Sequence, residues 1–352
     1  MIDPGARLPT SHDVARKARV SQSTVSRALR DDPRVNDATR ARVALAAKRL
    51  GYVRSERGRS LSTRRTNRIG VVVEDLENPF YLDLVNILHK QLERVDLRPI
   101  IFTAERTKGE GIERLVDGSI DGAILTTCSL GSALPMALRS VGFPVVLLNR
   151  VVDSDLVSSC STDNQLGATL MSNEVLRFGH RVIGAIFGPR DTSTGRDRET
   201  GLRAALQLRG VPLRKGLTWR GPFSYESGYR GLRHVSTAPT SPSCVICGND
   251  VIAIGAMNAA RSLGLRVPED ISIVGFDDIG MSAWELFDLT TVRQDMLRMA
   301  EVGIELLSSS IATPTAPVRQ VVLVPKLVRR NTLGPPPEAP GGPLASSVED
   351  YP

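Results

Sequence analysis

Residues 20–35 read VSQSTVSRALRDDPRV, and this stretch decides the fold of the first part of the chain. Three apolar side chains, those of Val25, Ala28 and Leu29, gather on one side of a helix that begins after Ser21. The other sides of that helix carry only hydrogen-bonding and basic side chains, namely Gln22, Ser23, Ser26, Arg27 and Arg30. The spacing therefore predicts a short helix with a buried apolar side and an exposed polar, basic side.

Two more helices are predicted around this one. Thr10 and Asp13 form a capping box, which predicts a helix start at that point. Asn36 can cap a third helix, and Gly51 ends it because glycine readily adopts the left-handed conformation of a helix C-cap. The first two helices are joined by a tight turn at residues 18–20. Together they form a helix-turn-helix, a motif whose second helix fits the major groove of DNA.

Positive charge is concentrated in the same region. Residues 1–68 contain 17 Lys and Arg and 6 Asp and Glu, whereas the rest of the 352 residues contain 28 and 32. This distribution indicates a small polyanion-binding unit attached to a larger body. The alternatives are a solvated basic tail or a solvated helical hairpin. A tail lacks the apolar periodicity, and a hairpin does not explain why its outer faces are basic.

Four short motifs follow one another along this region: DVA at 13–15, VSQSTVSRAL at 20–29, VNDATRARV at 35–43 and LGY at 50–52. On these motifs the stretch 12–61 resembles the lactose-repressor (LacI/GalR) family of bacterial transcription regulators. The resemblance implies an operator of double-stranded DNA. It also implies that Gln22, Ser23 and Arg27 contact base edges and that Ser21, Thr24 and Ser26 hold phosphates or bases. Arg30, on the exposed face of the same predicted helix, is added as a DNA-binding candidate. Arg19 stands where the family usually has Gly in the turn, and a left-handed residue there costs more than glycine.

The Arg- and Ser-rich residues 54–66 follow, and by composition alone they are a flexible linker. The family resemblance implies a hinge helix ending in Arg59-Ser60-Leu61, with Leu61 as a wedge in the minor groove. Arg54-Ser55 replaces the Pro-Asn opening of the family, and Gly58 replaces an Ala. Because glycine costs roughly 1 kcal/mol against alanine in a helix, this hinge helix is expected to be less stable.

From Ile69 onward, β-branched runs alternate with amphipathic stretches, and the series restarts after residue 164. Such alternation predicts parallel sheets covered on both faces, here two doubly wound lobes with a ligand cleft between them. The predicted architecture is an all-α helix-turn-helix head on an α/β body, and the resemblance implies the type I periplasmic-binding-protein-like fold for that body. The predicted ranges are a head over 1–53, a hinge over 54–66, lobe 1 over about 67–163 and 292–321, lobe 2 over about 164–291 and 322–330, and a disordered tail over 331–352.

Recognisable catalytic and cofactor motifs are absent from the sequence. No G-x-G-x-x-G, Walker A, G-x-S-x-G or H-E-x-x-H pattern occurs, and the four histidines are scattered. Cys244 and Cys247 lack the second pair or nearby histidines that a zinc site needs, so all four cysteines are expected to be structural. No cofactor, metal or catalytic residue is therefore predicted. Neither a signal peptide nor an apolar run of membrane-spanning length is visible, so a cytoplasmic protein without a membrane partner is expected. The family resemblance implies that it is bacterial and associated with the nucleoid.

Polar and aromatic side chains follow the predicted strands, as a cleft for a polyhydroxylated molecule requires. The alternative is that the Asn and Asp residues only cap the following helices. The family resemblance extends to about residue 330, with GLRVPEDISIVGFDD at 264–278 as its most specific stretch. It implies that Arg196 and Phe223 also hold the effector. The candidate effector-binding residues are Asn78, Phe80, Asn149, Arg150, Asp163, Arg196, Phe223, Asn249 and Asp277.

The functional prediction is a sequence-specific DNA-binding transcriptional regulator, with repressor favoured. Its partners would be a pseudo-palindromic operator, a second copy of the chain in a homodimer, and a small effector, a sugar or related metabolite. Two alternatives stay open: a solute-binding protein for transport, and an α/β enzyme with a nucleic-acid-binding appendage. The first predicts a signal peptide and no helix-turn-helix, and the second predicts a catalytic constellation at a strand end.

Overall fold

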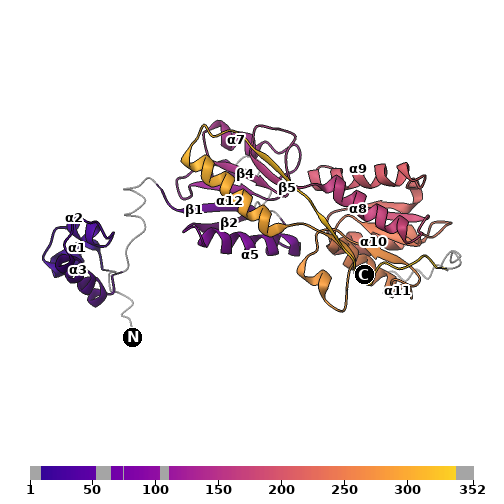
Figure 1. Cartoon of the computed structure of the whole chain (residues 1–352), viewed down its shortest axis with the longest axis horizontal. Helices are drawn as coiled ribbons and strands as arrows, with labels where there is room; N and C mark the ends of the chain where they lie inside the picture. Colours follow the sequence, from indigo (N-terminus) through magenta and orange to yellow (C-terminus); the bar gives the residue numbers. More distant parts are fainter. Residues whose placement is uncertain (1–8, 53–64, 74, 104–110, 338–352) are drawn as a thin grey trace. The chain divides into compact units, whose positions relative to one another are not determined.

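The computed structural model describes residues 9–52, 65–73, 75–103 and 111–337 (Figure 1). The chain divides into two compact units, Met1–Thr66 and Asn67–Pro352. The first unit is called the head here and the second the body.

Three helices form the head: α1 (Ser11–Ala18), α2 (Gln22–Ala28) and α3 (Asp37–Leu50). The predicted caps are confirmed, because Thr10 and Asp13 form a reciprocal capping box and the side chains of Ser21 and Asn36 accept bonds from their third following residues. Gly51 ends α3 in the left-handed conformation with φ 63°. Helix α2 ends at Ala28, shorter than the predicted span to residue 30.

The core of the head is small and apolar. The three helices contribute Val14, Ala15, Ala18, Val25, Ala28, Val43, Ala46 and Ala47, and the segment between α2 and α3 contributes Val35. Arg19 ends α1 with φ 53° and ψ 49°, the left-handed region where an L-residue is costly. The helix-turn-helix therefore forms without the glycine that would relax its turn.

Lobe 1 of the body is a six-stranded, all-parallel sheet with the order β11-β5-β4-β3-β1-β2. Its strands are β1 (Arg68–Val73), β2 (Arg98–Thr103), β3 (Gly122–Leu125), β4 (Val145–Leu148), β5 (Ser159–Thr162) and β11 (Gln320–Leu323). One face packs on α5 (Pro79–Glu93) and α12 (Met296–Ala312), and the other on α6 (Gly111–Leu115) and α7 (Leu134–Ser140).

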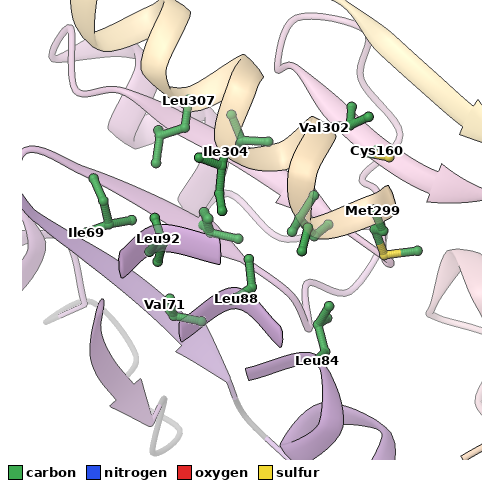
Figure 2. Packing of buried hydrophobic residues seen from close by; sticks show 14 of the residues in the cluster. Ile69, Val71, Leu84, Leu88, Leu92, Cys160, Met299, Val302, Ile304 and Leu307 are labelled. Atoms are coloured by element: carbon green, nitrogen blue, oxygen red, sulfur yellow. The ribbon is translucent and has the colours of Figure 1, made fainter. Parts of the chain in front are cut away.

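The larger core of lobe 1 lies between the sheet and the helix pair α5 and α12. Figure 2 shows Leu84, Leu88 and Leu92 of α5 on one side of this core, with Met299 and Leu307 of α12 approaching from the other. All five are at most 1% exposed. Fully burying such side chains contributes roughly 1.5–3 kcal/mol each, which holds the strand ends of this lobe in place.

Lobe 2 is a four-stranded parallel sheet with the order β7-β6-β8-β9. Its strands are β6 (Ile183–Phe187), β7 (Thr218–Arg220), β8 (Cys244–Cys247) and β9 (Ser272–Val274). Helices α8 (Asn164–Arg177) and α9 (Ser193–Leu208) cover one face, and α10 (Tyr225–Ser236) and α11 (Asp250–Ser262) cover the other. Two 3-10 turns, η1 (Lys215–Leu217) and η2 (Gly280–Ala283), complete the lobe. The predicted pair of doubly wound parallel-sheet lobes is confirmed.

The chain crosses between the lobes three times: after β5, after β10 (Thr291–Arg293), and between β11 and β12 (Lys326–Val328). Strands β10 and β12 pair antiparallel to each other. Residues beyond 330 were expected to be disordered, but Thr332 and Leu333 are buried, and the backbone carbonyl of Gly334 lies 2.8 Å from Nε2 of His180. These residues therefore belong to the body and not to a disordered tail, because Leu333 packs in the core of lobe 2.

The four cysteines are free and buried. Cys244 and Cys247 stand at opposite ends of β8, and the period of two along a strand places them on opposite faces of the sheet, in different cores. Within the described ranges, no helix is both long and apolar enough to cross a bilayer.

Candidate functional site

The outer face of α2 is polar and accessible. Ser21, Gln22, Ser23, Arg27 and Arg30 are exposed, while Thr24 and Ser26 are half-buried. The hydroxyl of Ser21 lies 2.8 Å from those of Ser23 and Thr24, so the N-terminus of α2 presents a cluster of donors and acceptors. Leu61, the predicted minor-groove wedge, lies outside the described residues, and its role stays a prediction.

The arginines of the head differ in how they are neutralised. Arg16, Arg34 and Arg40 each lie within 4.0 Å of an aspartate of the head. Arg27 has no ion-pair partner among the residues that the structure describes, and the Nε of Arg30 donates only to the carbonyl oxygen of Ser26. Arg27 on α2 and Arg30 just after it therefore keep a positive charge that is available to an external polyanion.

A small cavity lies in the body where the two lobes meet. Lobe 1 contributes Asn78, Phe80, Tyr81, Asn149 and Arg150, and lobe 2 contributes Thr194, Arg198, Phe223, Asn249 and Asp277. The free volume among these side chains is about 10 Å³. That is roughly the room for one water, so a larger ligand enters only if side chains or lobes move.

Several of these residues lie just after a strand, at the start of the next helix, because the carboxyl ends of parallel strands meet at one edge of a sheet. Asn78 caps α5 and Asn249 caps α11, each accepting a backbone N–H through its side-chain oxygen. Capping, the alternative considered for the Asx residues, is therefore one function of both. It occupies the Oδ1 atom and leaves the amide nitrogen of each residue as a potential donor in the lining of the cavity.

Two residues of the cavity have unusual backbone conformations. Asn149, directly after β4, has φ 66°, and Asp277 has φ 123°. Such conformations cost of order 1–3 kcal/mol each and persist where the surrounding structure enforces them. The turn at Asn149 directs Arg150 into the cleft, and the bend at Asp277 turns its carboxylate toward α9.

On the side of the cavity that lobe 2 forms, Arg198 and Asp277 make an ion pair. Their side chains are only 7% and 5% exposed. Arg198 donates three bonds of 2.8 Å, to the side-chain oxygen of Asn164, the carbonyl of Gly248 and Oδ1 of Asp277. Its guanidinium also lies 3.8 Å from the ring centre of Phe276. Burial raises the pKa of the Asp277 carboxyl, although Arg198 and Gln294 oppose this shift, and burial lowers the pKa of Arg198.

Arg150 provides the charge on the lobe 1 side, and it is 9% exposed. Its guanidinium lies 5.6 Å from the ring centres of Tyr81 and Phe223, which belong to different lobes. The Nη1 atom donates a long bond of 3.4 Å to the carbonyl of Thr127, and the Nε atom has no partner. Burial raises the pKa of Tyr81 to about 12, so its phenol stays protonated and can donate to a ligand.

Seven of the nine candidate effector residues line this cavity: Asn78, Phe80, Asn149, Arg150, Phe223, Asn249 and Asp277. Asp163 and Arg196 do not. Asp163 caps α8 and lines a separate, polar cavity beside β5 and β11. The Arg196 side chain is 42% exposed and pairs with Asp153 and Asp197.

The sequence interpretation chose the wrong arginine of α9 for this cavity. Gly201 faces α8 so closely that a Cβ there would lie 2.5 Å from the carbonyl oxygen of Gln165, which fixes the rotation of α9. Arg198 lies on that inner face with Thr194 and Gly201, whereas Arg196 points outward. Counting helical positions from Gly201 identifies Arg198 only once the fold shows that Gly201 faces α8. The other residues missed are Tyr81 and Thr194, for which only the neighbouring Phe80 and the start of α9 gave a signal.

Comparisons with known proteins identify relatives of both the head and the body. The model of the bacterial regulatory proteins, lacI family, matches residues 10–55, and that of the periplasmic binding protein-like domain matches residues 173–333. The ribose operon repressor of Escherichia coli strain K12 is 31% identical over 92% of this chain and 100% of the relative. The probable repressor ExuR of Bacillus subtilis strain 168 is 28% identical over 90% of this chain and 95% of the relative.

Solved structures agree with the sequence relatives. The regulator CelR in its cellobiose complex is 31% identical, with a TM-score of 0.70 over 92% of this chain and 99% of that one. The lac repressor dimer, bound to operator and the anti-inducer ONPF, is 25% identical, with a TM-score of 0.83 over 93% of this chain and 100% of that one.

A helix-turn-helix head on a two-lobed body with an interlobe cavity defines a ligand-responsive, DNA-binding class of protein. This chain belongs to the lacI family of bacterial regulatory proteins. It is therefore a transcriptional regulator, and the named relatives are repressors.

Proposed function

We propose that this protein is a repressor whose binding to a pseudo-palindromic operator is controlled by a small hydroxylated metabolite held between the lobes. The observation that carries the proposal is the interlobe cavity, in which each lobe supplies a buried arginine, aromatic rings and amides. A ligand that contacts both lobes favours one lobe arrangement over another, as does the operator. The two sites are then coupled, typically by 1–3 kcal/mol, or about 5- to 150-fold in affinity.

The DNA-binding part of the proposal rests on the exposed face of α2. Genomic fragments selected by the full-length protein identify the operator, and fluorescence anisotropy then measures its affinity against a scrambled duplex. Arg27→Ala is expected to weaken operator binding by about 1–3 kcal/mol if Arg27 contacts a base edge. Arg209→Ala, an exposed arginine of the body, is the matched control and is expected to change nothing. Equal affinity for every duplex at every metabolite level would refute the proposed function.

The assembly that we propose is a homodimer formed through the face of the body that carries α5, α11 and η2. Leu82, Trp284 and Leu286 are large apolar residues there with exposures of 47%, 56% and 73%. Asp83 accepts a bond from the backbone N–H of Gly280, so α5 and the turn η2 are neighbours. Large apolar side chains exposed on neighbouring elements favour an interaction surface.

Sedimentation of the double variant Trp284→Glu, Leu286→Glu tests the dimer. We expect a monomer, because two charges in an apolar interface are not compensated. Leu208→Glu, at an apolar side chain on α9 that is 85% exposed, is the control and should leave the dimer intact. A dimer in the double variant would place the interface elsewhere.

We further propose that the protein acts without catalysis, in the bacterial cytoplasm where the chromosome lies. The relatives support this because they are named as repressors. Turnover of sugars or nucleotides by the purified protein would contradict it.

A further inference from the structure

We infer that the ligand of the interlobe cavity is anionic: a hydroxylated metabolite that carries a carboxylate or a phosphate, bound at the guanidinium of Arg150. This inference rests on the proposed function, because it names the chemical class of the ligand for the same cavity. The argument depends on the charges of the cavity, on the free edge of Arg150 and on the unpartnered polar atoms beside it.

The charges of the cavity do not balance. Its described lining includes two arginines, Arg150 and Arg198, and one carboxylate, that of Asp277. Arg198 and Asp277 neutralise each other across 2.8 Å. One buried positive charge is left, on Arg150. A buried cation without a counter-charge is unfavourable, so a ligand that brings a negative charge gains from pairing with it.

The carboxylates near Arg150 accept hydrogen bonds from other groups. Among the described residues, no carboxylate lies within ion-pair distance of the Arg150 guanidinium. Asp75 and Asp277 act on it only through space. Asp75 accepts a bond from the backbone N–H of Asn78, and Asp277 accepts from Arg198 and Gln294. Arg150 is therefore not simply the partner of an acid in its own lobe.

The direction from which a ligand can reach Arg150 is also limited. The rings of Tyr81 and Phe223 lie by the guanidinium, each with its centre at 5.6 Å, and stacked rings leave the edge with its N–H groups free for hydrogen bonds. The Nε atom on that edge has no partner. A guanidinium edge binds carboxylate and phosphate oxygens in pairs through charge-assisted hydrogen bonds, whereas two neutral hydroxyls can only supply the geometry without the charge.

The same cavity holds groups suited to hydroxyls. Asn149 is 3% exposed, and its Oδ1 atom is buried without a hydrogen-bond partner, so it can accept from a ligand hydroxyl. The amides of Asn78 and Asn249 supply donors nearby. An acidic group at Arg150 and hydroxyls at the amides together describe a sugar acid or a sugar phosphate.

The experiment uses the full-length protein and matched pairs of ligands. Calorimetry measures affinity for galactose against galacturonate, glucose against gluconate, ribose against ribose 5-phosphate, and glucose against glucose 6-phosphate. We expect at least one acid to bind 10-fold or more tightly than its neutral counterpart. The first two pairs test the carboxylate and the last two the phosphate. The inference is overturned if a neutral sugar binds as tightly as its acid or more tightly, or if no acid in the panel binds.

Variants identify the residue responsible. Arg150→Gln is expected to weaken binding of the preferred acid by about 10- to 100-fold, since hydrogen bonds to charged groups contribute at this level. Arg150→Lys, which keeps the charge but not the paired geometry, should recover part of the loss. Arg196→Gln, an arginine outside the cavity, should bind as the original protein does. Unchanged acid affinity in a folded Arg150→Gln variant, checked by circular dichroism, would contradict the inference.

Operator binding separates this inference from the proposed function. If a neutral sugar changes the affinity for the selected operator and no acid does, the repressor function stands and the anionic ligand is wrong. If an acid binds but the protein has no preferred DNA site, the ligand class stands and the repressor function is wrong.

Discussion

Replacing Arg198 by methionine is expected to destabilise the body by about 3–5 kcal/mol, the usual result of removing one partner of a buried ion pair. Arg198 makes three bonds of 2.8 Å at 7% exposure, and its loss leaves the Asp277 carboxylate with Gln294 as its remaining side-chain partner. The matched variant Arg196→Met removes a guanidinium from the same helix at 42% exposure. Exposed pairs contribute about 0–1 kcal/mol, so this variant should differ little from the original protein.

Urea unfolding followed by tryptophan fluorescence measures both variants, because the only two tryptophans, Trp219 and Trp284, lie in lobe 2. Adding Asp277→Asn to Arg198→Met removes the unpaired charge, so the double variant should lose less than the sum of the single losses. Similar losses from Arg196→Met and Arg198→Met, or strictly additive losses in the double variant, would refute the view that this pair organises the cavity.

The loss of stability in Arg198→Met should depend on pH in a definite direction. Burial already raises the pKa of Asp277 above its value in the unfolded chain, and Arg198 opposes that shift. Without Arg198 the folded state takes up a proton at higher pH than before. Since the folded state then binds more protons than the unfolded state, the deficit of Arg198→Met should shrink as the pH falls from 8 to 5. If Arg198→Met lost the same free energy of unfolding at every pH in this range, Arg198 would not control the protonation of Asp277.

Three further predictions follow from the described contacts. Gly255→Ala should destabilise the body by more than about 3 kcal/mol, because a Cβ there would overlap the backbone carbonyl of the facing helix α10, whereas Gly216→Ala has open space and should be neutral in thermal unfolding. Burial, reinforced by the nearby Asp277 charge, raises the pKa of Asp250 to about 7, although its carboxylate accepts three hydrogen bonds. The folded state therefore holds a proton that the unfolded chain has lost. In urea unfolding, the original protein should lose stability relative to Asp250→Asn by up to about 1.4 kcal/mol per pH unit as the pH rises toward 7. Arg19→Gly should stabilise the head by up to about 1 kcal/mol because it relieves a left-handed turn, whereas Arg42→Gly within α3 should destabilise it by about 1 kcal/mol, both read from the melting of the head.

Local signals in the sequence were sufficient for the elements of the fold. Capping at Thr10, Ser21 and Asn36 depends on side chains within three residues of the backbone groups they satisfy, so the helices of the head could be read directly. The alternation of buried strands and helices likewise specified two parallel-sheet lobes, because strands covered on both faces must be apolar throughout. Most of the cavity residues could be predicted too, since the carboxyl ends of parallel strands meet at one edge.

Tertiary packing decided which side chains reach the cavity. Arg196 and Arg198 stand two residues apart in the same helix, and their sequence environment does not separate them. The contact of Gly201 with the backbone of Gln165 sets the rotation of α9, which buries one arginine beside Asp277 and leaves the other in solvent. The same holds for Arg150, whose two stacking rings come from different lobes and meet only in the folded body. Secondary structure follows from neighbours in the chain, whereas the charge balance of the cavity depends on contacts between residues 69 to 79 positions apart, which the chain makes only when it is folded.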